Sequence, residues 1–249
     1  MQEQKWRPDA VMEEKALEKK ARLEAISRGK SGIDDQTQAA RVAKEFQEGM
    51  IVNLGIGTPT LSSNFIPAGR EVLLHAENGA LGYGQVCGPD EGDPNLINAS
   101  GQPVKAQPGM SIFEHAESFA IIRGGFLDIT VMGAVQVSEK GDMSNWYIPK
   151  KGMGTIGGAM DLAFCAKRLI IIMSHVAKDG SYKIVKQCSY PITAPRCVGL
   201  IVTDIAVIEV TERGLVLKEV APGWTPDEVQ ALTEPKLVIA PDVHEIELT

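Results

Sequence analysis

Aromatic residues and cysteine are scarce in this chain of 249 residues. Aromatics make up 5% of it, no Lys/Arg stripe alternates with them, and the net charge is -7, so nucleic-acid binding has little support. The four cysteines lie far apart without a Cys-x-x-Cys pair, which argues against disulfides and zinc. No apolar run approaches the roughly eighteen residues of a membrane span, and no secretory signal is visible. We therefore expect a cytoplasmic protein that binds no membrane.

The composition, with 44% hydrophobic and 23% charged residues, suits one large globular domain or two intimately packed halves. The stretch "MEEKALEKKARLEAISRG" is rich in Ala, Glu, Lys and Leu, and Gly29 is a helix-stop signal. We predict an N-terminal helical extension over residues 1–35, either solvated or docked on a partner. Residues 36–249 form the main domain.

An alternation of strands and helices fills the main domain. Apolar runs rich in β-branched residues recur, such as "RLIIIMSHV", "LDITVMGAVQV" and "LIVTDIAVIEV". Several of the runs are hydrophobic instead of alternating, as expected for strands buried on both faces. Helical stretches such as "TQAARVAKEF" and "TPDEVQAL" separate them, the last with Thr225 as N-cap and Pro226 at the first helical position. The pattern predicts an α/β fold with a mixed, largely parallel sheet covered by helices on both faces.

Common nucleotide, metal and hydrolase motifs are missing. "NLGIGTPT" has Thr60 where a dinucleotide fingerprint needs its third glycine, and "RGKSG" lacks the first glycine and the strand of a P-loop. The four histidines show no ligand spacing and no Gly-x-Ser-x-Gly elbow exists, so we predict no metal site and no serine triad. His75 is interpreted as a structural histidine in preference to a catalytic one.

Two segments carry candidate chemistry. In "LLHAENGALGYGQ" an apolar strand ends at the carboxylate of Glu77, which is followed at once by flexible glycine-rich chain. In "KKGMGTIGGAMDLAF" a glycine cluster precedes a helix, where free backbone N–H groups favour negative charge and can stabilise an oxyanion. By itself this cluster is equally well explained as a close-packed loop.

These motifs resemble the family I coenzyme A transferases, specifically their B (beta) subunit. The likeness runs from "ENG" and "GYG" through "DPNLINASG", "ESFAIIRGG" and "DITVMGAVQVSEKGDMSNWYIP" to "GTIGGAMDLAF" and "APGWTPDEV", from about Gln36 to the C-terminus. It is greatest for the 3-oxoacid branch, the succinyl-CoA or butyrate–acetoacetate type. Ala76, where that branch usually has serine, and the long acidic loop "GQVCGPDEGDPN" depart from the pattern.

The resemblance implies covalent, ping-pong catalysis by Glu77. Its carboxylate would attack an acyl-CoA, and CoA would then be held as a glutamyl thioester until a second acid takes it. The backbone N–H of Gly158 would stabilise the oxyanion, with Gly157 shaping the turn. Coenzyme A and acyl-CoA are the substrates, and no metal or further cofactor is implied.

Other residues of the same motifs have weaker assignments. Asn78 either hydrogen-bonds the acyl group or stabilises the turn, and glycines such as Gly79 let the substrate approach the backbone. Core packing is favoured for Met132 and Trp146, and an ordinary ion pair for Arg123. Polar residues of pocket loops are also candidates for substrate binding: Gln85 and Asn145.

The family functions as paired alpha and beta chains, and 249 residues are too few for the fused form. We therefore expect an alpha (A) subunit as partner, in a heterodimer or heterotetramer. Two alternatives remain: hydrolysis of acyl-CoA through the same glutamate, and a CoA-binding subunit without catalysis. The sequence does not identify the carboxylic acids exchanged.

Overall fold

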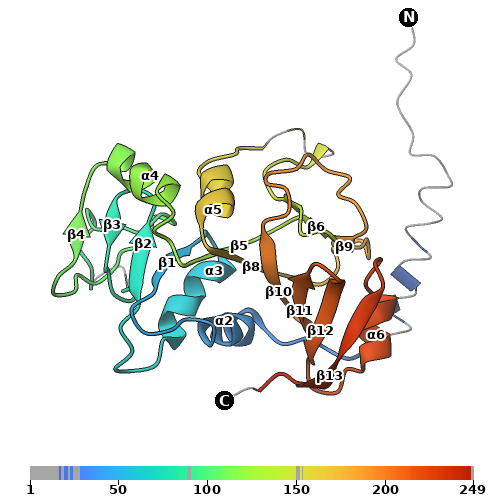
Figure 1. Ribbon diagram of the computed structural model, residues 1–249. Helices are drawn as coiled ribbons and strands as arrows, with labels where there is room; N and C mark the ends of the chain where they lie inside the picture. The colour runs from blue at the N-terminus through green and yellow to red at the C-terminus, as the bar shows by residue number, and fades with distance from the viewer. Residues whose placement is uncertain are drawn as a thin grey trace, which may run out of the picture.

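The computed structural model is built on a ten-stranded sheet whose centre is parallel. The central strands run in the order β10-β8-β5-β1-β2, and every neighbouring pair among them is parallel (Figure 1). Their bounds are β1 Ile51–Leu54, β2 Leu73–Ala76, β5 Ile129–Met132, β8 Arg168–Met173 and β10 Val198–Thr203. The structure describes residues 17, 20, 21, 23, 24, 29–88, 91–149, 152 and 154–247.

The margins of this sheet are mostly antiparallel. On one side β11 (Ala206–Thr211) and β12 (Gly214–Val220) follow β10 as antiparallel strands, and β13 (Leu237–Glu245) is parallel to β12. On the other side β3 (Ala80–Leu81) and β4 (Ser111–Ile112) follow β2 in antiparallel order. The predicted mixed, largely parallel sheet is confirmed.

Two apolar runs divide into separate strands. In "LIVTDIAVIEV" the chain reverses between β10 and β11, because Thr203 Oγ1 accepts hydrogen bonds from the backbone N–H groups of Ile205 and Ala206. In "LDITVMGAVQV" the chain leaves the main sheet after β5, and the next strand enters a small sheet of order β7-β6-β9. The strands of that sheet are β6 Gln136–Ser138, β7 Met143–Ser144 and β9 Ile184–Val185.

Helices cover both faces of the main sheet, as the sequence predicts (Figure 1). Ala39 and Val42 of α2 belong to one hydrophobic core, whereas Ile122 and Leu162 of α4 and α5 belong to the other. Helix α6 begins at the predicted Thr225 N-cap, which forms a reciprocal capping box with Glu228. The helix bounds are α2 Asp35–Ala43, α3 Thr58–Leu61, the 3-10 turn η1 Ser62–Phe65, α4 His115–Arg123, α5 Ala159–Cys165 and α6 Pro226–Ala231.

The N-terminal extension is described only in part. Leu17, Lys20, Ala21, Leu23 and Glu24 are helical, and the remainder of the predicted helix before Gly29 lies outside the described residues. The following segment is fastened to the C-terminal half of the chain. There the Ile33 N–H donates to Asp204 O at 2.7 Å, and Lys30 Nζ donates to Glu228 at 2.6 Å. The division at residue 35 stays a prediction.

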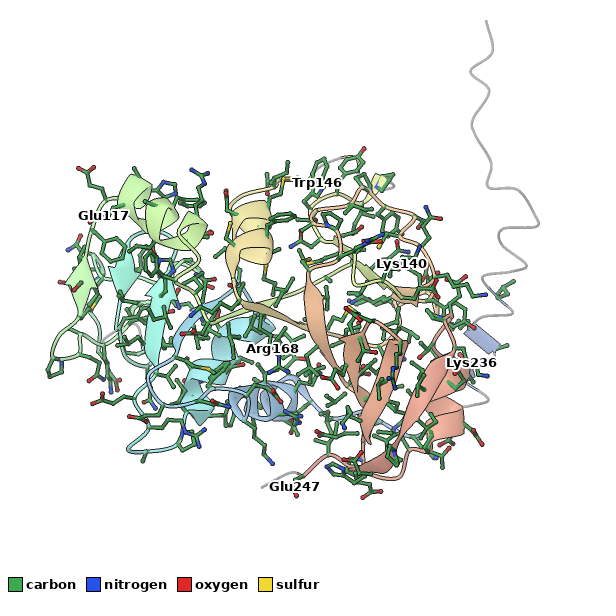
Figure 2. The ribbon with its side chains drawn as sticks, in the orientation of Figure 1. Glu117, Lys140, Trp146, Arg168, Lys236 and Glu247 are labelled. Atoms are coloured by element: carbon green, nitrogen blue, oxygen red, sulfur yellow. The ribbon has the colours of Figure 1, made fainter. Side chains whose placement is uncertain are left out.

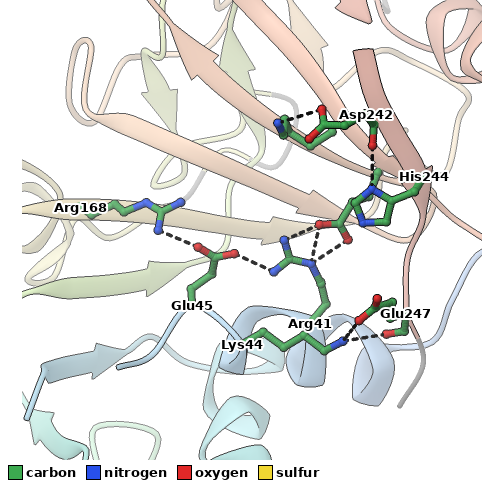
Figure 3. Close-up of polar contacts among 9 residues, drawn as sticks. Arg41, Lys44, Glu45, Arg168, Asp242, His244 and Glu247 are labelled. Atoms are coloured by element: carbon green, nitrogen blue, oxygen red, sulfur yellow. Dashed lines mark hydrogen bonds and ion pairs between the residues drawn. The ribbon is translucent and has the colours of Figure 1, made fainter. Parts of the chain in front are cut away.

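A partly buried ion-pair network joins α2 to the sheet (Figure 3). Arg41 pairs with Glu219 of β12 at 2.6 Å and with Glu45 at 2.7 Å, and Glu45 also pairs with Arg168 of β8 at 2.7 Å. Burial alone would raise the pKa of the Glu45 carboxyl, but the two guanidinium groups hold it below its ordinary value. The network fixes α2 against two strands that lie far apart in the sequence.

Candidate active site

Glu77 follows the last residue of β2 and occupies a tight turn into β3. The turn depends on Gly79, which has φ +118 and whose N–H donates to Ala76 O at 3.0 Å. A Cβ on Gly79 would collide with the carbonyl oxygen of Phe113, so only glycine fits this position. The Asn78 side chain points out of the turn and donates to Ile97 O at 2.9 Å. The turn therefore fixes Glu77 at the carboxyl edge of the parallel strands.

The Glu77 carboxylate lies against Gly158, the N-cap residue of α5. A Cβ on Gly158 would overlap Glu77 Oε2 and would lie 2.9 Å from Phe119 Cζ of α4. No side chain other than hydrogen fits there. The two candidate residues, far apart in the sequence, are thus in direct contact.

Glu77 Oε2 is buried and has no hydrogen-bond partner within the described chain. Burial raises the pKa of the Glu77 carboxyl, and a Coulombic interaction with the nearby His115 opposes that rise. His115 packs on Phe119 in a tilted arrangement, with ring centroids 4.6 Å apart, and both side chains come from α4. A carboxylate without tight partners, held in a half-buried position, is suited to attack an electrophile.

A cavity of about 440 Å³ opens beside Glu77. Its walls come from the carboxyl ends of β1 and β5, the segment after β5, the loop before α5 and the loop that carries Ala99. This is the edge at which open α/β sheets bind their ligands. The lining residues are Asn53, Leu54, Gly55, Ile56, Glu77, Ala99, Met132, Gly133, Ala134, Val135, Asn145, Thr155, Ile156, Gly157, Gly158, Ala159 and Leu162.

His75 is a buried structural histidine, as the sequence interpretation favours. The Asn53 amide nitrogen donates to His75 Nδ1 at 3.1 Å, which leaves the ring proton on Nε2, 3.1 Å from Ser118 Oγ. Burial lowers the pKa of His75 to about 4, so the ring is neutral. Asn53 also donates to His75 O at 3.1 Å, and the network therefore ties β1, β2 and α4 together directly behind Glu77.

The predicted site residues fall into two groups. Glu77, Asn145, Gly157 and Gly158 line the cavity, and so does Met132. The Asn145 carboxamide oxygen accepts from Thr193 Oγ1 at 2.7 Å, which fixes its side chain.

Three predicted residues are absent from the described walls of the cavity: Asn78, Gly79 and Gln85. Gln85 is exposed, and its backbone oxygen accepts from the Lys105 N–H at 3.0 Å. Arg123 forms the expected ion pair, with Asp161 at 2.8 Å. Trp146, labelled in Figure 2, is half-buried and packs on Tyr147.

The sequence does not predict that residues of α4 and Asn53 form part of the surroundings of Glu77. His115 and Phe119 lie in "EHAESFAIIRGG", where neither spacing nor composition distinguishes them from ordinary helix residues. Asn53 is a polar residue in the otherwise apolar "MIVNLGIG", and this interruption is the one available signal.

Among the residues that the structure describes, no three or more His, Cys, Asp or Glu side chains are grouped to hold a metal ion. No helix in the described ranges has the length and apolar character needed to cross a membrane.

Comparison with known proteins identifies the family. Residues 35–232 match the family described as Coenzyme A transferase. The B-type chain of the 3-oxoadipate CoA-transferase of Pseudomonas putida is 48% identical over 201 residues, which cover 80% of this chain and 94% of that protein. The beta chain of a probable coenzyme A transferase of Bacillus subtilis is 46% identical over 209 residues, which cover 84% and 96%.

A solved structure shares the fold. An acyl-CoA transferase of Escherichia coli O157:H7 superposes with a TM-score of 0.69 at 21% identity, over 86% of this chain and 43% of that one. This chain therefore spans less than half of that longer protein. The sequence relatives and the family match agree with the site geometry: the chain belongs to the coenzyme A transferase family.

Proposed function

We propose that this chain is the beta-type subunit of an enzyme that moves CoA between an acyl-CoA and a carboxylic acid through a thioester on Glu77. The observation that carries this proposal is the contact between the Glu77 carboxylate and Gly158, beside a cavity at the carboxyl edge of the sheet. The relatives with 46% and 48% identity are named as beta-type chains of CoA-transferases, which supports the assignment.

The first half-reaction makes the enzyme thioester. A Glu77 carboxylate oxygen attacks the acyl-CoA carbonyl carbon, the C–S bond breaks, and a mixed anhydride and CoA thiolate form. The thiolate then attacks the Glu77 carbonyl carbon, which releases the first carboxylic acid as its carboxylate and leaves a glutamyl-CoA thioester. The second acid reverses both steps, so a new acyl-CoA leaves and the Glu77 carboxylate is regenerated.

Each carbonyl attack creates a tetrahedral oxyanion, and we assign the Gly158 N–H as its donor. Gly158 is the N-cap of α5 and touches the carboxylate, and N–H groups at the start of a helix have no intrahelical partner. Such a donor contributes about 3 kcal/mol to transition-state stabilisation. The scheme uses no cofactor beyond the CoA of the substrate.

A 3-oxoacid such as acetoacetate is the acid we propose. The Pseudomonas putida relative is named for 3-oxoadipate, which is also a 3-oxoacid. The cavity of about 440 Å³ accommodates a short acyl chain. Met132 and Ala134 provide apolar wall, and Asn145 provides a fixed amide that can face the oxo group.

We propose further that an alpha-type chain completes the site. Two residues of the cavity wall, Ile56 and Ile156, remain 70% and 38% exposed, and Phe164 on α5 is 69% exposed. Exposed apolar side chains grouped around a site are typical of a surface that a partner covers. The names of the relatives as one chain of two agree with this arrangement.

The test uses this chain co-purified with its alpha-type partner. The complex is incubated with acetoacetyl-CoA without acceptor, treated with borohydride, and digested for mass spectrometry. We expect the carboxyl of Glu77 to be reduced to an alcohol, because borohydride reduces a thioester and not a free carboxylate, and Glu77→Gln to remain unlabelled. Release of CoA on incubation without acceptor, at the rate of turnover, would favour hydrolysis. An unmodified Glu77 with every acyl-CoA tried would support a non-catalytic subunit.

A further inference from the structure

A second and larger hollow, of about 820 Å³, lies away from the Glu77 cavity, and we call it the basic groove. It shares no lining residue with that cavity. Figure 2 shows two of its residues, Lys140 and Lys236, on the opposite side of the molecule from Glu117 of α4. The walls are Glu139, Lys140, Arg196, Val198, Val210, Thr211, Glu212, Arg213, Gly214, Leu215 and Lys236.

Positive charge predominates in the basic groove, although the protein as a whole is acidic. Two lysines and two arginines line it against the two carboxylates of Glu139 and Glu212, an excess of two positive charges in a chain of net charge -7. The cations come from segments far apart in the sequence: Lys140, Arg196, Arg213 and Lys236.

The guanidinium groups in the basic groove lack the partners that other arginines have. Within the described chain, neither Arg196 nor Arg213 donates a side-chain hydrogen bond or forms an ion pair, although carboxylates line the same groove. Each of the other described arginines donates to a protein oxygen: Arg41, Arg70, Arg123 and Arg168. Both side chains are exposed, so their forks of donors face solvent and are available to a ligand in this hollow.

The backbone of Arg196 has an unusual conformation that a hydrogen bond to Asp142 helps to fix. It has φ +49, a left-handed conformation that costs a non-glycine residue about 1–2 kcal/mol. The Arg196 N–H donates to Asp142 Oδ1 at 3.1 Å, and Asp142 itself accepts from Ser138 Oγ at 2.8 Å. Strained positions that the surroundings enforce are concentrated at ligand sites. These hydrogen bonds hold the Arg196 backbone beside the groove.

The floor of the basic groove is apolar. Val198 and Leu215 are buried, and Val210 beside them is half-buried. Apolar floor and convergent polar groups in a hollow of this volume are typical of small-molecule sites. A segment of an acidic protein would bind through charges spread along a surface, and its carboxylates would gain nothing from contact with an apolar floor.

We propose that the basic groove binds a phosphorylated small molecule of the nucleoside diphosphate class. Arg196 and Arg213 bind the phosphate oxygens through their planar forks of N–H donors, with the two lysines as additional charges. The ring of the ligand lies on the floor of Val198 and Val210. The site is separate from the transfer reaction at Glu77 and does not depend on it.

Isothermal titration with ADP tests the proposal on the full chain in complex with its alpha-type partner. We expect saturable binding that Arg196→Ala/Arg213→Ala weakens by about tenfold or more, because charge-assisted hydrogen bonds are lost. The control is Lys105→Ala/Lys186→Ala, which removes two exposed cations elsewhere and keeps the affinity. Arg213→Ala alone leaves the strained Arg196 backbone unchanged and is expected to weaken binding as well.

The proposal fails if ADP gives no saturable heat, or if the double variant binds ADP as tightly as the original protein. Binding of ADP in the Glu77 cavity would give that second result. A polyglutamate peptide that binds through the same arginines when ADP does not would assign the groove to an acidic protein segment instead. Borohydride labelling of Glu77 is measured separately, so neither result depends on the other.

Discussion

Gly158→Ala is the substitution that most directly tests the contact between Gly158 and Glu77. The new Cβ would overlap Glu77 Oε2 and lie 2.9 Å from Phe119 Cζ. An unbonded carbon–oxygen contact needs roughly 3.3 Å, so the carboxylate has to retreat by about 1 Å, a displacement that typically costs about 10²-fold in rate. Gly158 has φ -83, which alanine adopts freely, so the backbone adds no strain. Overpacking lowers the free energy of unfolding by about 1–3 kcal/mol.

Gly157→Ala is the matched control, because its expected defect comes from backbone strain and not from a steric clash with Glu77. Gly157 has φ +54, and a Cβ there meets nothing within 4 Å. Alanine therefore costs about 1–2 kcal/mol of stability through its backbone and leaves Glu77 undisturbed. We would measure turnover of acetoacetyl-CoA, the labelled fraction of Glu77, and unfolding by denaturant in the complex of both chains. Turnover of Gly158→Ala equal to that of Gly157→Ala would refute the proposed geometry.

Three further predictions concern stability and pH. Arg41→Met leaves the buried Glu219 without its guanidinium, whereas Glu45 keeps Arg168, and we expect the free energy of unfolding to fall by about 3 kcal/mol in denaturant titrations at pH 7. Because burial lowers the pKa of His75 to about 4, its contribution to stability is complete above pH 6.5 and is lost as the pH falls toward 4, by up to ~1.4 kcal/mol per pH unit; His75→Asn removes this part of the slope. His115→Gln removes the Coulombic interaction that opposes the burial-raised pKa of Glu77, so the acid limb of kcat/KM moves to higher pH.

Each of these predictions has its own control. Lys218→Met breaks a more exposed ion pair with Asp242 and is expected to change stability by less than ~1 kcal/mol, so an equal cost for Arg41→Met would contradict the network argument. An unchanged slope of stability between pH 6.5 and 5 in His75→Asn would show that this histidine is not the group that titrates. An unmoved acid limb in His115→Gln would remove His115 from the environment of Glu77.

Periodicity predicts the parallel centre of the sheet well, because β5, β8 and β10 are largely buried and mostly apolar, without polar–apolar alternation. It does not predict where a chain leaves a strand. The β10–β11 reversal depends on one threonine hydroxyl that accepts two backbone N–H groups, inside a run that stays apolar on both sides. The pairing of β12 with β13 and the formation of a separate small sheet also depend on tertiary packing, which local periodicity does not predict.

At the site, the sequence predicts the reacting residues but not the neighbours that surround them. Glu77 and Gly158 are marked by local features, a carboxylate after an apolar strand and a glycine before a helix. Their contact across 81 positions is not a local property. Phe119, which completes the contact, has the same apolar character as any core residue of a helix. Asn78 follows Glu77 but points elsewhere, because successive residues of a turn face different directions, and Gln85 lies beyond β3, outside the cavity wall.

The surroundings of Glu77 reflect the two states that the proposed reaction requires of one side chain. The carboxylate must be charged to attack, yet it becomes a neutral anhydride and then a neutral thioester. A close ion pair would stabilise the charged form and oppose its conversion, whereas complete burial would protonate the carboxyl and stop the attack. In the structure one oxygen is buried without a partner, burial raises the pKa, and His115 moderates the rise without a hydrogen bond. The neutral His75 network behind Glu77 adds rigidity and no charge, so the position of the carboxylate is fixed while its charge stays free to change.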